Sequence, residues 1–473
     1  MKLKAREAAE LVKGRLVRGD GGRTAAGVST DTRSLAKGQG FIALQGPNFD
    51  GHAFIKEADK KGAAWIIAEK SKARGIRTSA ALIETEDTLK ALGMLAADHR
   101  RRFDIKVAAI TGSLGKSTVK EMAASVISSK GRVLKNKGNL NNRIGVPQTI
   151  FKINRSHRYA VLETGCNEPG EIGELTRIAG PDVGLITCAA PVHLEGLGSV
   201  EGVARAKAEM IKELSANSTF VLNLDDALIK RHARNFKGNI IGFSKGPVTD
   251  FTGECLCLVD IDKEVIGGRP RINFLVERRK GGKRTGKPVR FYLWTLAGHN
   301  AMNALAAASL GRVFNVSLAE AARKLRGFKG LPGRGEVVRS PGGAFIMNDT
   351  YNASPESVAN ALSTMCWWKG PMRGVAVLGD MYELGEKSVD YHREVGRRAV
   401  REGVSLLVAK GEMAEEMVEA ARREGLPSDA TFAVKDNARA ADILKKRLQR
   451  GDWVLVKGSR STAMEEVVKA ISG

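Results

Sequence analysis

The sequence has no long apolar run, and this absence argues against two classes of protein. No stretch of the 473 residues reaches the 18 consecutive apolar residues of a membrane-spanning helix. The basic N-terminal segment has no apolar run before Gly14, whereas a secretory signal peptide carries one. We therefore expect neither membrane insertion nor secretion, and we predict a cytoplasmic protein.

Cysteine is also scarce. The five cysteines are Cys166, Cys188, Cys255, Cys257 and Cys366. They form no CxxC pair and have no histidine partners at the spacing of zinc sites, and an odd number in a long chain does not indicate a disulfide framework. We predict buried free thiols, with neither a disulfide nor a structural metal.

Acidic residues are too few to balance the basic ones. The chain has 52 acidic and 76 basic residues, a net charge of +24. This excess favours nucleic acid, a membrane surface or an acidic small molecule as the partner. The densest basic segment, residues 278–290, has seven basic residues but no aromatic side chain that could stack on a base. We interpret it as a solvated hairpin loop between INFLV and FYLW, and we expect no nucleic-acid partner.

The length predicts about three domains, and the hydrophobic pattern predicts their class. Short apolar runs alternate with amphipathic helical stretches, which is typical of an α/β fold. The runs at 40–44 and 65–68 flank a helical stretch at 52–61, and residues 84–102 are predicted to form a connecting helix. We place the three domains at residues 1–83, 84–313 and 314–473.

Two sets of nearly continuous apolar runs follow the connecting helix. The first lies at 105–111, 159–163, 182–187 and 220–224, and the second lies at 344–349, 374–380, 406–411 and 453–458. Strands buried on both faces of a parallel sheet have this pattern. The sequence therefore predicts a parallel sheet in the central domain and a smaller, separate α/β domain after it.

A glycine-rich turn follows the strand at 105–111 and precedes a helical stretch. It consists of Thr111, Gly112, Ser113, Leu114, Gly115, Lys116, Ser117 and Thr118. Such a turn offers backbone N–H groups and the positive end of a helix to phosphate, while Lys116 can reach terminal phosphates and Ser117 can ligate Mg²⁺. Only the shortened pattern GxxGKS is present, because Ile110 stands where GxxxxGK[ST] requires glycine. An ordinary glycine-rich turn is the alternative.

Glu163 ends one further predicted strand, and His193 follows another within a few residues. Ligands of an open parallel sheet bind at the carboxyl ends of its strands, so both can converge with Ser117 on one crevice. A carboxylate and an imidazole beside phosphates suit Mg²⁺ or Mn²⁺. Taken alone, Glu163 could cap a helix and His193 could be a loop histidine. Lys207, on a later helical stretch, has by position alone the pattern of a solvated charge.

A second group of polar residues suits a nucleotide. It contains Asn300, Asn303, Arg334, Asp349 and Tyr351. Amides can bind adenine edges, arginine can bind phosphate as a bidentate fork, and tyrosine offers a stacking face. The helix after His299 is rich in alanine, so Asn303 could instead be a packing or capping residue.

Taken together and in this order, the motifs resemble those of the Mur ligases of peptidoglycan synthesis, over nearly the whole chain. The matching segments include STDTR (29–33), TGSLGKSTVKEM (111–122), ETGCNEPGEI (163–172), AGHNAMNALAA (297–307), DTYNASPES (349–357) and KGSRSTAMEE (457–466). The resemblance implies an N-terminal domain for the UDP-linked substrate, a central P-loop ATPase domain with a mainly parallel sheet, and a C-terminal Rossmann-like domain that closes over the site.

The resemblance also implies an activity, an ATP-dependent amide ligation through an acyl phosphate. The segment DTYNASPES is similar to that of members that add D-alanyl-D-alanine to UDP-N-acetylmuramoyl-tripeptide, forming the pentapeptide precursor. Members that add one amino acid to the UDP-muramyl-dipeptide are the nearest alternative, although the DNPR-type motif of their diaminopimelate form is absent here. An alternative of another class is a nucleic-acid-stimulated P-loop ATPase. We expect a monomer.

Residue roles follow from the same resemblance. The implied catalytic residues are Lys116, Lys207 and His193. ATP would be bound by the glycine-rich turn together with Asn300, Asn303, Arg334, Asp349 and Tyr351. Mg²⁺ or Mn²⁺ would be bound by Ser117, Glu163, His193 and a carbamylated Lys207, and the muramyl substrate by Ser29, Thr30, Arg33, Asn139 and Asn142. The sequence departs from the family at Leu114, where Asn is usual, at Thr164, where Met is usual, and at Ser117, where Thr is usual. Serine keeps the hydroxyl ligand, whereas Leu114 removes an amide from the loop.

Overall fold

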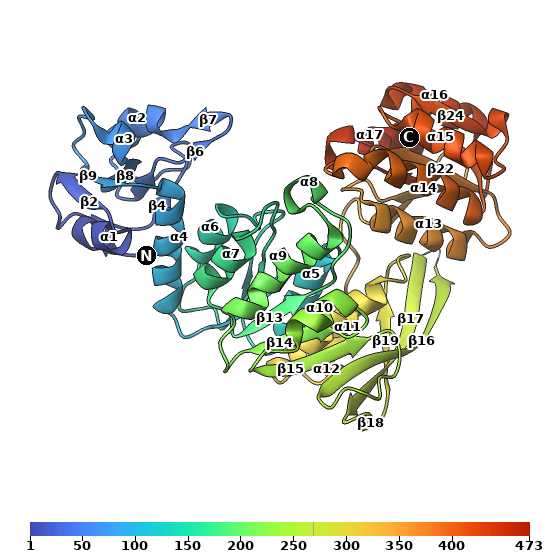
Figure 1. Ribbon diagram of the computed structural model, residues 1–473, viewed down its shortest axis with the longest axis horizontal. Helices are drawn as coiled ribbons and strands as arrows, with labels where there is room; N and C mark the ends of the chain where they lie inside the picture. The colour runs from blue at the N-terminus through green and yellow to red at the C-terminus, as the bar shows by residue number, and fades with distance from the viewer. Residues whose placement is uncertain (268) are drawn as a thin grey trace.

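The computed structural model describes residues 1–267 and 269–473 and shows three α/β domains. The N-terminal and C-terminal domains stand on either side of the central domain, so that the molecule has the outline of an open V (Figure 1). Within the described ranges, no helix has both the length and the apolar character needed to cross a membrane. The α/β class predicted from the apolar runs is confirmed.

The N-terminal domain is built on a five-stranded sheet. Its order is β2 (Arg15–Arg18), β9 (Ala81–Thr85), β8 (Trp65–Glu69), β5 (Gly40–Ile42) and β4 (Val28–Ser29). Both predicted runs are strands, and the predicted helical stretch between them is η1 (Gly51–Phe54) followed by α2 (Ile55–Lys60). Trp65 is fully buried and its indole N–H donates to the Leu3 carbonyl, 3.2 Å away, which ties the sheet to the N-terminal segment.

The predicted connecting helix is α4 (Thr88–Arg101), and it joins the first two domains. Asp87 caps it, because its carboxylate accepts from the Lys90 N–H at 2.9 Å. The helix packs on α1 (Ala5–Leu11) of the N-terminal domain and on α6 (Gly145–Ile150) and α7 (Glu171–Ala179) of the central domain. One rigid element therefore contacts both domains.

The central domain contains a ten-stranded sheet. Its order is β11 (Val133–Lys135), β12 (Tyr159–Glu163), β10 (Lys106–Thr111), β13 (Val183–Ile186), β14 (Thr219–Asn223), β15 (Asn239–Ser244), β16 (Glu254–Ile266), β17 (Arg269–Lys280) and β18 (Lys283–Arg284), with β19 (Val289–Leu293) also paired to β17. The strands from β11 to β16 are parallel and the rest antiparallel.

Helices cover both faces of the parallel part. Ile110 packs toward α5 (Lys116–Ile127) and α11 (Asn300–Val313), whereas its neighbour Ala109 packs toward α9 (Val200–Glu213). Successive strand residues point to opposite faces, so both faces need apolar side chains. This explains the continuous apolar runs of the sequence.

The basic segment 278–290 is a correction to the sequence analysis. It does lie in a hairpin connection, but it is largely strand rather than loop. Residues 278–280 complete β17, where Arg278 pairs with Leu256 of β16, and residues 289–290 begin β19. The β16–β17 hairpin itself was not predicted. Along β17, buried Ile272, Phe274 and Val276 alternate with partly exposed residues, and four consecutive charged residues, 277–280, follow them.

The C-terminal domain has a six-stranded sheet. Its order is β20 (Glu336–Arg339), β21 (Phe345–Asn348), β25 (Trp453–Lys457), β22 (Gly374–Gly379), β23 (Val404–Lys410) and β24 (Thr431–Val434), with β20 alone antiparallel among these strands. The helices α13 (Pro355–Lys369), α14 (Ser388–Arg401), α15 (Ala414–Arg423), α16 (Asn437–Arg447) and α17 (Glu465–Ser472) surround it (Figure 1). All four predicted runs of this domain are strands.

Two further features bear on the sequence predictions. Helix α12 (Leu318–Leu325) packs on α5 and β19, so it lies with the central sheet although it follows residue 313, the predicted end of that domain. All five cysteines are free thiols, as predicted, but Cys188 and Cys366 are only partly buried.

Candidate active site

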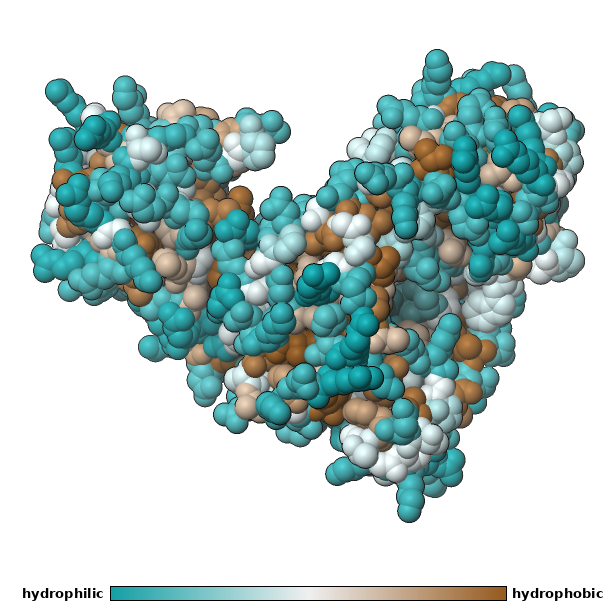
Figure 2. Space-filling view, viewed as in Figure 1, coloured by the Kyte–Doolittle hydropathy of each residue, from teal (hydrophilic) through white to brown (hydrophobic). Residues whose placement is uncertain are grey.

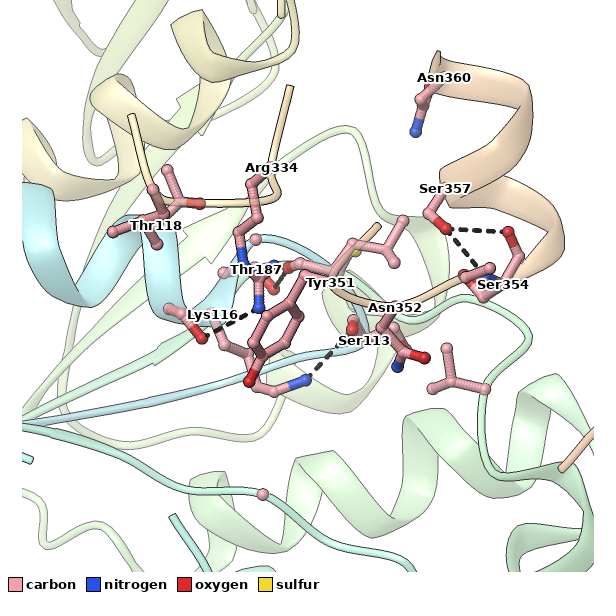
Figure 3. Close-up of a pocket in the computed structure, with 18 of the residues that line it drawn as sticks. Ser113, Lys116, Thr118, Thr187, Arg334, Tyr351, Asn352, Ser354, Ser357 and Asn360 are labelled. Atoms are coloured by element: carbon pink, nitrogen blue, oxygen red, sulfur yellow. Dashed lines mark hydrogen bonds between the residues drawn. The ribbon is translucent and has the colours of Figure 1, made fainter. Parts of the chain in front are cut away.

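A cleft of about 820 Å³ lies where the strand-end loops of the central sheet face the C-terminal domain. Figure 2 shows the molecule hollowed between its outer domains, and Figure 3 shows the side chains that line the cleft. Of the residues singled out in the sequence, the following line it: Ser113, Leu114, Gly115, Lys116, Ser117, Thr118, Asn139, Asn142, Glu163, His193, Asn300, Asn303, Arg334, Asp349 and Tyr351. Residues far apart in the sequence therefore meet at one site.

The glycine-rich turn joins β10 to α5 in a conformation that requires its glycines. Gly112 has φ of 141° and Gly115 has φ of 78°, a region that favours glycine. A Cβ on Gly112 would lie 1.8 Å from Oγ1 of Thr187. The Thr187 hydroxyl in turn donates to the Leu114 carbonyl at 2.5 Å. The loop is thus closely packed against the end of β13, with Leu114 held through its backbone rather than its side chain.

Lys116 starts helix α5 and folds over this loop. Its ammonium donates to the carbonyls of Gly112 at 2.7 Å and Ser113 at 3.1 Å (Figure 3). Burial, together with the nearby Lys207 ammonium, lowers the pKa of Lys116 to about 8. The Lys116 side chain therefore lies against the backbone of the turn.

Glu163 ends β12 and is almost completely buried, with 2% of its surface exposed. Its Oε1 accepts from Ser117 Oγ at 3.2 Å and from Asn141 Nδ2 at 2.8 Å. Its Oε2 accepts no hydrogen bond from the described part of the chain and lies 3.4 Å from Nζ of Lys120, which is 1% exposed. The helix-cap alternative for Glu163 does not hold, because its carboxylate faces side chains of the cleft.

The residues present fit a magnesium ion. Glu163 and Ser117 offer oxygen ligands side by side, and one buried carboxylate oxygen is without a hydrogen-bond donor. Mg²⁺ prefers oxygen and usually binds through one or two carboxylates together with substrate phosphates. Among residues 1–267 and 269–473 no group of three or more His, Cys, Asp or Glu side chains is placed to hold a metal ion. The donors that fit Mg²⁺ here are therefore the oxygens of Glu163 and Ser117.

His193 lies across the cleft, at the start of α8 (Leu194–Leu197). Its Nδ1 is hydrogen-bonded to Oε2 of Glu383 from the C-terminal domain. Burial lowers the pKa of His193, while the Glu383 carboxylate opposes that change. The histidine therefore has a defined carboxylate partner on the other domain and differs from a free loop histidine.

Lys207 is buried in α9, with 1% of its surface exposed, so the interpretation as a solvated charge is wrong. Within the described ranges, the side-chain hydrogen-bond partner of its ammonium is Cys166 Sγ, 4.0 Å away. Burial lowers the pKa of Lys207. A buried ammonium without a carboxylate partner is costly, so this position favours a form of the side chain without positive charge. Lys207 does not line the cleft directly.

Among the nucleotide candidates, Asn303 of α11 lies directly beside the glycine-rich turn, where a Cβ on Gly115 would come within 2.5 Å of its Oδ1. Asn303 donates to Oδ1 of Asn300 at 2.9 Å, and Asn300 donates to Thr295 Oγ1 at 3.0 Å. Arg334 lies over the Tyr351 ring, 4.0 Å from its centroid, and its Nη2 is 3.4 Å from Ser117 Oγ (Figure 3). Arg334, from the segment between α12 and β20, thus reaches the glycine-rich turn.

Asp349 is held by the C-terminal sheet. The Lys457 ammonium, 3% exposed, lies 2.6 Å from its Oδ2 and also donates to the Asn352 carbonyl at 2.9 Å. The carboxylate is therefore fixed at the cleft edge.

The predicted substrate residues are divided between two places. Asn139 and Asn142 line the cleft, whereas Ser29, Thr30 and Arg33 do not. Thr30 Oγ1 accepts from Gln148 of α6 at 2.9 Å, so this segment lies at the junction of the N-terminal and central domains. Arg33 is highly exposed and paired with Asp31. The structure does not bring these three residues to the phosphate loop.

The sequence analysis missed Lys120, Asn141, Glu383 and Lys457. Only Lys120 had a usable signal, since it lies one helical turn after Ser117 on the same face of α5. The other three contact their partners across long sequence separations, which no local pattern reveals.

Comparisons with known proteins agree with this geometry. Residues 24–100, 110–311 and 333–460 match the families described as the Mur ligase family catalytic domain, the Mur ligase middle domain, and the Mur ligase glutamate ligase domain. Among curated relatives, the UDP-N-acetylmuramoyl-tripeptide–D-alanyl-D-alanine ligase of Bacillus subtilis is 33% identical over 98% of this chain and 96% of its own length. The enzyme of the same name from Escherichia coli is 32% identical over 94% and 93%.

Solved structures show the same relationship. A crystal structure of MurF from Acinetobacter baumannii has a TM-score of 0.86 at 27% identity, covering 100% of this chain and 99% of the other. MurF from Thermotoga maritima in complex with ADP has a TM-score of 0.79 at 28% identity, covering 94% and 96%. Family models that match most of the chain, relatives above 30% identity and full-length structural similarity lead to one conclusion: the chain belongs to the Mur ligase family.

Proposed function

We propose that this protein is the ATP-dependent ligase that joins D-alanyl-D-alanine to UDP-N-acetylmuramoyl-tripeptide, forming the UDP-muramyl-pentapeptide precursor of peptidoglycan. The observation that carries the proposal is the cleft, in which the phosphate loop of the central sheet faces Asp349 and Tyr351 of the C-terminal domain. The names of relatives that match almost the whole chain supply the substrates.

The first chemical step is phosphoryl transfer. An oxygen of the terminal carboxylate of the tripeptide attacks the γ-phosphorus of ATP, the bond to the bridging oxygen breaks, and ADP leaves. Both reactants are anionic, so catalysis depends on positioning and charge compensation. The Lys116 ammonium and the N–H groups of the turn would hold the phosphates, and Asn139 and Asn142 would face the muramyl peptide.

The second step forms the amide. The amino group of D-alanyl-D-alanine attacks the acyl-phosphate carbon, inorganic phosphate leaves, and the amine loses a proton. Residues at the C-terminal side of the cleft would hold this acceptor close to the loop. The net charge of +24 favours the binding of ATP and of the UDP-muramyl-tripeptide, which are both polyanions.

We propose that Ser117, Glu163 and His193 hold Mg²⁺, or Mn²⁺ in its place. The ion supplies charge compensation at the transferring phosphoryl group when bound. We further propose that Lys207 is carbamylated, which turns a buried ammonium into a carboxylate that can serve the metal site. Its burial without an acidic partner supports this assignment.

The remaining assignments are also proposals. Asn300, Asn303, Arg334, Asp349 and Tyr351 would contact the nucleotide. Ser29, Thr30 and Arg33 would contact the UDP-muramyl end on the N-terminal domain, and the domains would divide near residues 83 and 313. We propose that the protein acts as a monomer without a nucleic-acid partner. Residues of the basic segment 278–290 do not line the cleft, so their positive charges do not contact the proposed ATP site.

One assay tests the function. Phosphate release is measured with ATP, Mg²⁺ and UDP-muramyl-tripeptide, with and without D-alanyl-D-alanine, and the product is identified by mass. We expect release to require all components. Equal activity with a free amino acid in place of the dipeptide would move the assignment to the amino-acid-adding member of the family. Stimulation by DNA or RNA, with a steep dependence on salt, would instead support a nucleic-acid-stimulated ATPase.

A further inference from the structure

The central and C-terminal domains touch in several places, for example where the Trp368 indole N–H donates to the Leu296 carbonyl at 2.7 Å, and one paired contact lies beside the cleft. The His193 imidazole bonds through Nδ1 to Oε2 of Glu383, and the backbone N–H of Leu194 donates to the Glu383 carbonyl at 2.8 Å. A side-chain bond and a backbone bond therefore join the same short segments, residues 193–194 and Glu383.

Both partners have an unusual backbone. The described residues include five non-glycine residues with positive φ, and two of them are His193 at 51° and Glu383 at 63°. Such conformations cost free energy and persist where the surroundings impose them, commonly at functional sites. Here the two strained residues contact each other.

The surroundings do impose the conformation of Glu383. Immediately before it, the Met381 N–H donates to Nε2 of His392 at 2.9 Å, and the Tyr382 N–H donates to Ser459 Oγ at 3.0 Å. His392 is itself fixed, since its Nδ1 bonds to the Ser388 carbonyl at 2.7 Å. The loop after β22 is thus held from α14 and from the segment after β25, and it presents Glu383 to the central domain.

The contact is poorly suited to a purely stabilising role. The Glu383 side chain is 52% exposed, and exposed ion pairs contribute little to stability. It is well suited to orienting an imidazole. A carboxylate on Nδ1 fixes the proton there and leaves the Nε2 lone pair free, which is the arrangement found around metal-binding histidines.

We propose that Glu383 is a positioning residue, which holds His193 in the Nδ1–H tautomer and orientation needed at the metal site and does so only when the C-terminal domain is docked. The proposal deepens the proposed function and rests on it for the role of His193. On this proposal, the metal site of the central domain has its complete set of oriented ligands only when the C-terminal domain is docked against it.

The test compares Glu383→Ala with Glu383→Gln in the full-length protein. Glutamine keeps an oxygen that can accept from Nδ1–H, whereas alanine removes it. Glu386→Ala is the matched control, because Glu386 lies three residues after Glu383 in the short 3-10 helix η2 (Gly385–Lys387), is exposed, and its side chain makes no hydrogen bond or ion pair within the described residues. The first measurement is the ¹⁵N shift of the His193 ring in protein labelled at its seven histidines. The second is the affinity for Mn²⁺ in the presence of ADP, by electron paramagnetic resonance.

We expect His193 in the wild type and in Glu386→Ala to show one tautomer, protonated at Nδ1. Glu383→Ala should show a mixture of tautomers and a loss of Mn²⁺ affinity of about tenfold or more, the usual effect of removing such a partner. Glu383→Gln should recover most of both. An unchanged ring spectrum together with unchanged Mn²⁺ affinity in Glu383→Ala would overturn the proposal, as would equal losses in the alanine and glutamine variants.

The failure of the proposed function would look different. Neither measurement uses the muramyl-tripeptide or the dipeptide, so both can give the expected result even if the wild-type protein does not ligate them. Conversely, a wild-type protein that makes the pentapeptide while Glu383→Ala keeps its ring spectrum and Mn²⁺ affinity would retain the function and refute the role of Glu383.

Discussion

Lys120 and Glu163 form a buried ion pair whose disruption should be costly. The Lys120 ammonium lies 3.4 Å from Glu163 Oε2 and 3.2 Å from the Gly138 carbonyl. Both side chains are 2% exposed. Replacement of Lys120 by Met keeps the approximate length and apolar stem of the side chain but leaves the Glu163 carboxylate buried without a cation.

The expected cost follows from this geometry. Removing one partner of a buried pair destabilises by about 3–5 kcal/mol, because the other charge stays desolvated. In a domain of this size each kcal/mol lowers the melting temperature by about 2–4 °C. We therefore expect Lys120→Met to lower the melting temperature of the central domain by about 6–20 °C in the absence of a metal.

Differential scanning calorimetry of the full-length protein measures this effect, with the transition of the central domain followed separately. Lys130→Met is the control, since Lys130, just after the end of α5, forms a partly exposed ion pair with Glu320 and its replacement should cost little stability. The double variant Lys120→Met/Glu163→Gln should recover much of the loss, because no charge is then left unpaired. Mg²⁺ with ADP should raise the melting temperature of Lys120→Met more than that of the wild type.

Two results would refute this reasoning. The first is a Lys120→Met variant that melts as the wild type does. The second is a double variant no more stable than Lys120→Met, which would show that lost packing rather than the unpaired carboxylate causes the effect.

Three further predictions concern the cleft and the basic hairpin. Lys116→Ala should lower turnover by about 10²-fold or more while calorimetry shows an intact fold, because the variant loses charge compensation at the phosphoryl group; near-normal turnover would show that the loop does not bind phosphate as proposed. Lys207→Ala should be nearly inactive and partly restored by acetate or formate, as measured by phosphate release; full activity without an additive would exclude carbamylation. Replacement of residues 281–287 by a short glycine turn, which spares the β17 and β19 residues, should leave folding and ligation intact; loss of ligation alone would give the segment a role in substrate binding.

The sequence was informative where its pattern is local. The runs around Ile110, Glu163 and Val375 were predicted as strands because both faces of a parallel strand are buried, and the phosphate loop was predicted because its glycines and Lys116 are adjacent. The antiparallel hairpin of β16 and β17 was missed because its strands contain runs of consecutive charged residues, such as 262–264 and 277–280. A half-exposed strand with many charges has a sequence similar to that of a loop.

The candidate site was less accessible to sequence reasoning. The contact between His193 and Glu383 joins residues 190 positions apart, and that between Glu163 and Asn141 joins residues 22 apart. Such pairs depend on strand order and domain docking, which hydrophobic periodicity does not specify. Burial was also hidden: Lys207 has the sequence environment of an exposed helical lysine, yet it lies inside the domain.

Thr30 is bonded to Gln148 of α6 and lies away from the cleft. If the UDP end of the donor is held there, its reacting carboxylate must extend from one domain to the phosphate loop of another, and α4, packed on both domains, fixes that span. One residue of extended peptide covers about 3.3–3.6 Å. A donor shorter by one residue would place its carboxylate that far from the loop, where a displacement of about 1 Å already costs about 10²-fold in rate. The first two domains would then act as a molecular ruler that selects the tripeptide by its reach.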